Sequence, residues 1–337
     1  MTSLKSLAEH LGLSQATVSR ALNNYSTVNA ETRERVLRAA REMEYRPNAS
    51  ARRLATGKAG AYGMILTTEG TPMLDPQFSD FMAGLTEALA GKERDVVLGG
   101  SPNERSTATY ERFIRACKVD GFVITRPLLG DSRAELLERL GVPFVLHGRT
   151  APEPDHAYYD IDNFGAFQRA TELLMQLGHR KIALLNGRVD AMFAIMRRDG
   201  FLAGVNGLAR AQTPISETPM TEQEGFRCMR AALETGVTAA ICSSIHLALG
   251  AERAIHDAGL ALGRDMSLIC HDDDLSGLST VSFSAPLTVT RAPIRDAGRA
   301  IAGMLEQLCD GADRASQQII APVELILRAS TRPPITP

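Results

Sequence analysis

The sequence predicts an α/β protein with a small all-α head at its N-terminus, and three observations support this expectation. Residues 1–46 place apolar side chains at the spacing of short helices. From residue 60 onward, short apolar runs alternate with helical patterns, which is typical of doubly wound parallel sheets. The segment 60–337 is longer than one such sheet needs, so we expect a body of two lobes. Residues 47–59 are expected to link the head to this body.

The head is expected to form three helices, each preceded by a polar residue that can cap its N-terminus. The first runs from Leu4 to Leu11 after Ser3, and Gly12 ends it. The second runs over residues 15–22 after Ser14, and the third runs from residue 30 to about residue 43 after Asn29. The side chains expected in the core of the head are Leu4, Leu7, Ala8, Leu11, Val18, Ala21, Leu22, Val36, Leu37, Ala40 and Met43.

The first two helices and their short turn have the pattern of a helix-turn-helix, whose second helix enters the DNA major groove. On that helix Arg20 can pair with guanine, Gln15 can pair with adenine, and Ala16 offers a methyl contact to thymine. Thr17, Ser19 and Asn23 have short polar side chains suited to the phosphate backbone, and Ser14, the cap of this helix, completes the expected set of DNA contacts. The same pattern also fits a small helical bundle with a solvated polar face.

The segment after the head combines basic residues with one exposed apolar side chain. Asn48 can cap a short helix that ends at Gly57. Such a helix is too short to be stable alone, so we expect it to order on DNA or against a second copy. Leu54 among arginines has the composition of a minor-groove wedge, and Asn48, Arg52 and Leu54 are therefore predicted DNA contacts. The alternative is a plain flexible linker.

The body is expected to hold eight strands with helices between them. The expected strands are Tyr62–Thr67, Val96–Gly99, Gly121–Thr125, Phe144–His147, Ile182–Asn186, Ala239–Cys242, Ser267–Cys270 and Leu287–Thr290. Expected helices include Phe78–Ala90, Ala108–Cys117, Ala134–Leu140, Phe164–Leu177 and Leu247–Ala258. Ligands of such sheets bind outside the carboxyl ends of the strands, so two facing lobes would line one cleft.

Charge and cysteine usage narrow the class of protein. Residues 1–58 hold ten Lys or Arg and five acids, a net charge of +5, whereas the whole chain has −2, which leaves −7 for the rest. A basic head on an acidic body suits a polyanionic partner. Five scattered cysteines without a CxxC pair indicate reduced thiols and no metal site. No signal-peptide core and no apolar run of membrane length are present, so we expect a cytoplasmic, nucleoid-associated protein without a cofactor.

The head and the link closely resemble those of the lactose-repressor (LacI/GalR) family of bacterial transcription regulators. The resemblance is carried by the runs ATVSRALN, ETRERVL and YRPNASARRLATG. It implies that Gln15, Ala16 and Arg20 read bases and that Leu54 opens the minor groove together with the same leucine of a second copy. It also implies a dimer on pseudo-palindromic operator DNA.

The body resembles the family's type I periplasmic-binding-protein-like module. Matching runs are LGHRKIALLNG, RRDGFLAGV, DMSLICHDDD, PLTVTRAP and ELILRAST. The resemblance implies an N-lobe of about residues 60–160 and 289–320 and a C-lobe of about 161–288 and 321–337. The chain would cross between them near residues 160, 288 and 320. No apolar heptad tail follows, so a dimer is expected rather than a tetramer.

The resemblance further implies a small effector, in this family usually a sugar, between the lobes. Arg197 stands in the family's Arg-x-x-Gly position and Asp272 begins its Asp-Asp pair, so both are expected to contact hydroxyl groups. Without the resemblance, Arg197 and Asp272 could each simply belong to an ion pair on the surface. The other candidate effector contacts are Asp75, Phe78, His147, Arg149, Asp162, Phe193 and Ser244. Phe78 also fits the core, and Asp162 also fits a helix cap.

Two positions depart from the family's usual pattern. Gly148 stands where an acid is expected, and Ser244 with Ile245 replaces an Asn-Asp pair. The runs VLHGR, YDIDNFGAF, FAIMRRDG and ICSS resemble those of the α-glucoside regulators.

The sequence therefore predicts a DNA-binding repressor whose operator affinity a sugar controls. The alternatives are a regulator that needs a non-sugar corepressor and a sugar-binding receptor without a DNA function. An enzyme is disfavoured because no GxSxG, HExxH or phosphate-binding loop is present.

Overall fold

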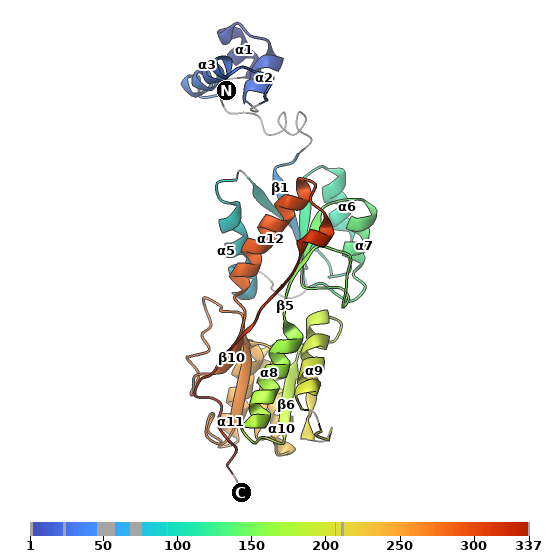
Figure 1. Ribbon diagram of the computed structural model, residues 1–337, viewed down its shortest axis with the longest axis vertical. Coiled ribbons are helices and arrows are strands. Elements are labelled where there is room, and N and C mark those ends of the chain that lie inside the picture. The colour runs from blue at the N-terminus through green and yellow to red at the C-terminus, as the bar shows by residue number, and fades with distance from the viewer. Residues whose placement is uncertain are drawn as a thin grey trace. The chain divides into compact units, whose positions relative to one another are not determined.

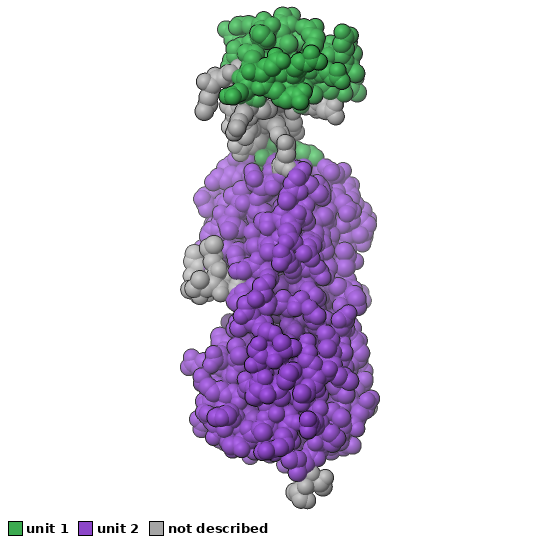
Figure 2. All heavy atoms as spheres, turned by 90° about the vertical axis from the view of Figure 1, so that its left-hand side faces the viewer, with its two compact units in different colours: residues 1–59 green, residues 60–337 purple. Residues whose placement is uncertain are grey.

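The computed structural model describes residues 3–22, 25–45, 58–67, 76–92, 94–205, 207–209 and 212–335. It divides into two compact units, residues 1–59 and residues 60–337, which Figure 2 shows in different colours. Five of the predicted contact residues lie outside the described residues, and so does the expected linker helix. These residues are Asn23, Asn48, Arg52, Leu54 and Asp75.

Unit 1 contains the three helices α1 (Leu4–Leu11), α2 (Gln15–Leu22) and α3 (Ala30–Glu42). Ser3 caps α1, because its hydroxyl accepts a hydrogen bond from the backbone N–H of Ser6, and Gly12 ends that helix with φ of 65°. The Asn29 side chain likewise accepts from the N–H of Thr32 at the start of α3. The core of unit 1 is formed by Leu7, Ala8, Val18, Ala21, Val28, Val36, Ala39 and Ala40.

One predicted core residue of unit 1 is wrong. Leu37 is 40% exposed, and Ala39 is buried instead. Helix α3 buries the stripe at positions 36, 39 and 40, which share one face at the i, i+3, i+4 spacing, and Leu37 lies about 100° around the helix from Val36.

Unit 2 contains two six-stranded sheets, which define its two lobes (Figure 1). The sheet of lobe 1 has the order β11-β5-β4-β3-β1-β2 and is parallel throughout. Its strands are β1 (Ala61–Thr67), β2 (Asp95–Ser101), β3 (Gly121–Thr125), β4 (Phe144–His147), β5 (Tyr158–Ile161) and β11 (Gln318–Ala321).

The sheet of lobe 2 has the order β12-β10-β9-β8-β6-β7, and its strands are parallel except for β12, which runs antiparallel to β10. Its strands are β6 (Ile182–Asn186), β7 (Ile215–Glu217), β8 (Ala239–Cys242), β9 (Ser267–Asp272), β10 (Thr288–Arg291) and β12 (Glu324–Ile326). The chain passes between the lobes after β5, after β10 and between β11 and β12.

Helices cover both faces of each sheet. In lobe 1, α5 (Pro76–Leu89) and α12 (Ile294–Cys309) pack together on one face, and α6 (Ala108–Arg115) and α7 (Ser132–Arg139) cover the other (Figure 1). In lobe 2 the pairs are α8 (Asn163–Gln176) with α9 (Met192–Gly204), and α10 (Glu222–Glu234) with α11 (Ile245–Asp257). A 3₁₀ turn, η3 (Arg314–Gln317), precedes β11.

Helices α5 and α12 approach each other closely enough for their backbones to touch. A Cβ atom on Gly84 would lie 1.9 Å from the carbonyl oxygen of Arg295, and one on Gly298 would lie 2.2 Å from that of Phe81. Only glycine fits at these two positions. The two helices therefore form one tightly packed layer of lobe 1.

All eight expected strands are present within a residue or two of their expected ends, and four short strands were not expected. The unexpected strands are β5, β7, β11 and β12. Three of them lie at sheet edges, where a strand can be short and partly polar.

Candidate functional site

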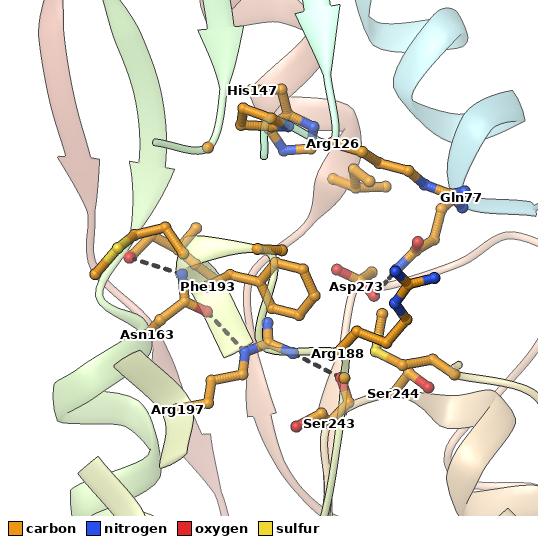
Figure 3. A pocket seen from close by; sticks show the side chains of 18 of the residues that line it. Gln77, Arg126, His147, Asn163, Arg188, Phe193, Arg197, Ser243, Ser244 and Asp273 are labelled. Atoms are coloured by element: carbon orange, nitrogen blue, oxygen red, sulfur yellow. Dashed lines mark hydrogen bonds between the residues drawn. The ribbon is translucent and has the colours of Figure 1, made fainter. Parts of the chain in front are cut away.

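A cavity of about 670 Å³ lies between the two lobes of unit 2, within the usual size range of small-molecule sites. Its walls come from the segments that follow the carboxyl ends of strands in both sheets. Lobe 1 contributes Arg126 after β3 and His147 at the end of β4, and lobe 2 contributes Ser243 after β8 and Asp273 after β9. Figure 3 shows Arg126, His147 and Asp273 around one space, whereas Ser243 turns its hydroxyl to Asn186, to which it donates at 2.7 Å.

Arg197, on α9, is a buried side chain of the cavity wall that other segments hold in place. It is 5% exposed, its Nε donates to Asn163 Oδ1 at 2.7 Å, and its Nη1 donates to the carbonyl oxygen of Ser243 at 2.6 Å. Its guanidinium lies 5.1 Å from the ring centre of Phe167 and 5.0 Å from that of Phe193. In Figure 3 its third nitrogen points into the cavity. Burial lowers the pKa of Arg197 to about 10, so it stays charged at neutral pH.

A buried chain of hydrogen bonds connects Arg197 to lobe 1. Asn163 donates from Nδ2 to Asp160 Oδ1 at 3.0 Å, and Arg149 donates from Nε to Asp160 Oδ2 at 2.7 Å. Arg149 also donates to the carbonyl oxygen of Pro152. The predicted contact Arg149 thus lines the cavity, but its charge is neutralised by Asp160.

The carboxylate that faces the cavity is Asp273, which corrects the expectation of Asp272. Asp272 turns away, because its Oδ2 accepts from the Thr280 hydroxyl at 2.8 Å and its Oδ1 accepts from the N–H of Asp274 at 2.9 Å. Asp273 lines the cavity, and its Oδ2 accepts from Gln77 Nε2 at 2.5 Å.

The neighbours of Asp273 keep it ionised. Burial opposes its charge, but His271, Arg197 and the hydrogen bond from Gln77 together hold the pKa of Asp273 below its ordinary value. His271 Nε2 lies 3.4 Å from Asp273 Oδ1, and its Nδ1 is 3.1 Å from the Thr290 hydroxyl. Burial lowers the pKa of His271. Among the charged residues of the cavity wall, Asp273 and Arg197 therefore form a buried pair of opposite charge.

Three other predicted contacts also line the cavity. His147 stacks on Phe81 with ring centres 5.0 Å apart, and Phe193 forms part of the lobe 2 wall. Ser244 lines the cavity while its hydroxyl accepts from the N–H of Leu247, which caps α11.

Besides Asp272, two predicted contacts do not line the main cavity. Asp162 caps α8, since its Oδ1 accepts from the N–H of Gly165 at 2.8 Å, and its Oδ2 pairs with Arg169 at 3.1 Å. Phe78 faces a smaller cavity of about 110 Å³ inside lobe 1 and packs against the core.

Besides Asp273, three residues that were not predicted shape the cavity: Gln77, Asn163 and Arg126. Gln77 is next to the predicted residue Phe78, and Asn163 is next to the predicted residue Asp162. The prediction therefore identified the right segments of the chain but named the neighbouring residue in each. Arg126 has φ of 51°, a strained backbone of the kind that gathers at functional sites, but this signal exists only in the structure.

In unit 1 the predicted base-reading residues lie together on the exposed face of α2. Gln15, Ala16 and Arg20 are exposed, whereas Val18 between them is buried. The Ser14 hydroxyl accepts from the N–H of Thr17 at 3.1 Å and lies 2.8 Å from the Thr17 hydroxyl, so both residues secure the start of α2. Thr17 and Ser19 are half-buried.

In the part of the chain that the structure describes, no helix has the length and apolarity to cross a membrane. Within the same residues, no group of three His, Cys, Asp or Glu side chains is placed to hold a metal ion.

Two family models match the chain. Residues 3–48 match "Bacterial regulatory proteins, lacI family", and residues 59–329 match "Periplasmic binding proteins and sugar binding domain of LacI family". The HTH-type transcriptional regulator AglR of Rhizobium meliloti (strain 1021) is 46% identical over 98% of this chain and 94% of its own. The HTH-type transcriptional regulator RafR of Escherichia coli is 32% identical over 94% and 95%.

Among solved structures, the lac repressor dimer bound to operator and the anti-inducer ONPF is similar, with a TM-score of 0.80. It is 28% identical and covers 98% of this chain and 99% of its own. The matches to both units and the identity along nearly the whole length agree with the geometry of the cavity and of α2. The chain belongs to the LacI family of DNA-binding transcriptional regulators.

Proposed function

We propose that this regulator represses transcription by binding a pseudo-palindromic operator as a homodimer, and that a small neutral sugar in the cavity weakens that binding. The observation that carries the proposal is the fixed guanidinium of Arg197 beside the carboxylate of Asp273. Sugar recognition needs planar donors, acceptors and an apolar platform at one place. Arg197 supplies the donors, Asp273 the acceptor, and the ring of Phe193 the platform.

The charges of the cavity favour a ligand without net charge. Arg149 pairs with Asp160 at 2.7 Å and Arg188 pairs with Asp190 at 2.5 Å, so these four residues offer no net charge to a ligand. Arg197 and Asp273 carry opposite charges, Arg126 and Glu104 add one charge of each sign, and Glu222 pairs with Arg253 at 2.9 Å. An anionic or cationic ligand would have to compete with these pairs, whereas hydroxyl groups can bind to them as they stand.

For DNA, we propose that α2 lies in the major groove. Gln15, Ala16 and Arg20 would face base edges, since all three are exposed on one helix face. The set Ser14, Thr17, Ser19, Asn23, Asn48 and Arg52 would contact the backbone, and Leu54 would enter the minor groove. A dimer places two such helices in successive major grooves.

The proposed effector class is an α-glucoside, in line with the sequence runs shared with that branch of the family. The sugar would lower operator affinity by about 5- to 150-fold, the range of typical coupling free energies of about 1–3 kcal/mol. We expect the sugar to release the regulator from its operator and not to tighten operator binding.

A mobility-shift titration of the full chain tests this proposal. Operator DNA from the chain's own promoter region is titrated with protein in the presence of maltose, sucrose or trehalose, with cellobiose and lactose as β-linked controls. At least one α-glucoside should weaken binding at millimolar concentration, and the same sugar should raise the melting temperature of unit 2 by mass action. Operator affinity that is indifferent to every sugar contradicts the proposed effector, and tighter binding contradicts the proposed sign.

A further inference from the structure

Two side chains of α5 reach across the cleft to the segment that follows β9 in lobe 2. Gln77 Nε2 donates to Asp273 Oδ2 at 2.5 Å. One turn along α5, Asp80 Oδ2 accepts from the N–H of Ser276 at 2.8 Å, and Asp80 Oδ1 accepts from its hydroxyl at 2.5 Å. Residues three apart share a helix face, so one face of α5 holds both contacts.

A further hydrogen bond crosses the cleft away from α5. The N–H of Leu129, before α7, donates to the carbonyl oxygen of Asp190, before α9, at 2.9 Å. Figure 1 shows α7 and α9 on one side of unit 2 and α5 on the other. On the α9 side Arg149 Nη2 also donates to Met196 Sδ at 2.6 Å, so the lobes are bridged on both sides of the cavity.

The two α5 contacts differ in their relation to the cavity. Gln77 and Asp273 both line it, whereas Asp80 and Ser276 do not. A carboxylate only accepts hydrogen bonds and offers about four lone-pair sites. On Asp273, Gln77 occupies one oxygen and the other faces His271 at 3.4 Å. The acceptor proposed for a sugar hydroxyl is thus already bound by the opposite lobe.

We propose that a ligand hydroxyl binds Asp273 Oδ2, the oxygen that the Gln77 amide already bonds, and that Gln77 is therefore a specificity-determining residue that acts as an internal competitor. This inference rests on the proposed sugar-binding function. Binding then exchanges a protein hydrogen bond for a ligand hydrogen bond, instead of filling an open acceptor.

The competition changes how the cavity treats a sugar that lacks the hydroxyl. A site with an unpaired buried acceptor rejects such an analogue strongly, because the acceptor has lost its water and gains no partner. With Gln77 present, Asp273 keeps a partner when the hydroxyl is missing. Gln77 therefore weakens binding of the full ligand and makes the cavity tolerant of deoxy analogues.

Calorimetric titration of the full chain with maltose and its monodeoxy derivatives tests the competition. Q77A should bind maltose about 3- to 10-fold more tightly than the unsubstituted chain. The ratio between maltose and its most weakened deoxy derivative should widen by about tenfold. S276A is the matched control, because it removes a cleft-spanning bond outside the cavity, and it should leave both quantities unchanged. Weaker maltose binding by Q77A, or the same effect in S276A, overturns the inference.

Hydrogen exchange without any sugar separates failure of this inference from failure of the proposed function. Q77A should raise backbone exchange in residues 273–276 several-fold. Q168A, which removes a glutamine bonded to Glu172 on α8, should not do so. Unchanged exchange in Q77A overturns the inference whatever the sugars do. Raised exchange in Q77A supports the bond between Gln77 and Asp273. If no tested sugar then binds either the unsubstituted protein or Q77A, the proposed effector class is wrong instead.

Discussion

The two candidate sites of this chain hold their functional side chains in opposite ways. On α2 of unit 1, Gln15, Ala16 and Arg20 are exposed, and the buried residues beneath them only fix the helix. In the cavity of unit 2, Arg197 and Asp273 are each held by partners from other segments. Exposed side chains must be ordered by their partner, whereas held side chains are already placed for it. The difference predicts that single substitutions act locally on α2 but disturb several neighbours in the cavity.

Replacing Arg197 should have the largest effect. R197A removes the charged donor proposed for the sugar and leaves Asn163 Oδ1 and the carbonyl of Ser243 without their donor. Hydrogen bonds to charged groups contribute about 1.5–3 kcal/mol each, so loss of one such bond to the sugar should lower its affinity by about 10- to 150-fold. Operator binding should persist but no longer respond to sugar in a mobility-shift assay.

The neighbouring R198A is the matched control for that variant. Arg198 pairs with Asp199 and Glu217 and does not line the cavity, so sugar affinity should stay within about twofold of the unsubstituted chain. Equal losses in the two variants would mean that charge alone, and not the position of Arg197, decides sugar binding.

Replacing Arg20 should change the binding of DNA and leave the binding of sugar unchanged. If Arg20 pairs with a guanine, R20A should lose about 1–3 kcal/mol of discrimination between operator and mismatched DNA. R38A removes the same charge from the exposed surface of α3 and should lower affinity for both DNAs alike. Fluorescence anisotropy with matched and mismatched duplexes measures both. Unchanged discrimination in R20A argues against the placement of α2 in the groove.

Acidification should lower the stability of unit 2, with a smaller effect than the substitutions of Arg197 and Arg20. Burial lowers the pKa of His147, His179 and His271 below the ordinary value. Above the unfolded pKa of about 6.5 these residues are neutral in both states and stability does not change. Below it the unfolded chain binds protons that the folded chain resists, so stability falls by at most about 1.4 kcal/mol per pH unit for each histidine.

Thermal unfolding between pH 8 and pH 5 measures this loss. H147F keeps the stacking on Phe81 and removes one titrating ring, so its melting temperature should fall less steeply with pH. A melting temperature that is constant or rises as the pH drops below 6.5 contradicts the assignment of neutral buried histidines.

The head could be predicted almost to the residue because its helices are specified locally. The bounds of α1 and α2 follow from the caps Ser3 and Ser14 and from Gly12, all within a few residues of the helices they limit. Leu37 was misplaced because α3 has more apolar residues than its buried face can hold.

The cavity resisted prediction because its partners are distant along the chain. Gln77 and Asp273 are 196 positions apart, and no local pattern connects them. Which of Asp272 and Asp273 faces the cavity depends on how the chain turns after β9. Thr280 donates to Asp272 and holds that carboxylate away from the cavity. The strands β7 and β12 have three residues each, too few to show an alternation.

The glycine contact between α5 and α12 has a mechanical consequence. With Gly84 against the Arg295 carbonyl and Gly298 against that of Phe81, no deformable side chain separates the two helices. Only two residues separate the strand β10 from α12, so we expect a rotation of that connection between the lobes to move α12 and α5 together. Gln77 lies in the first turn of α5, so we expect it to move with the α5–α12 pair as one rigid body. A larger residue in place of Gly84 or Gly298 would push the two helices apart and weaken this coupling.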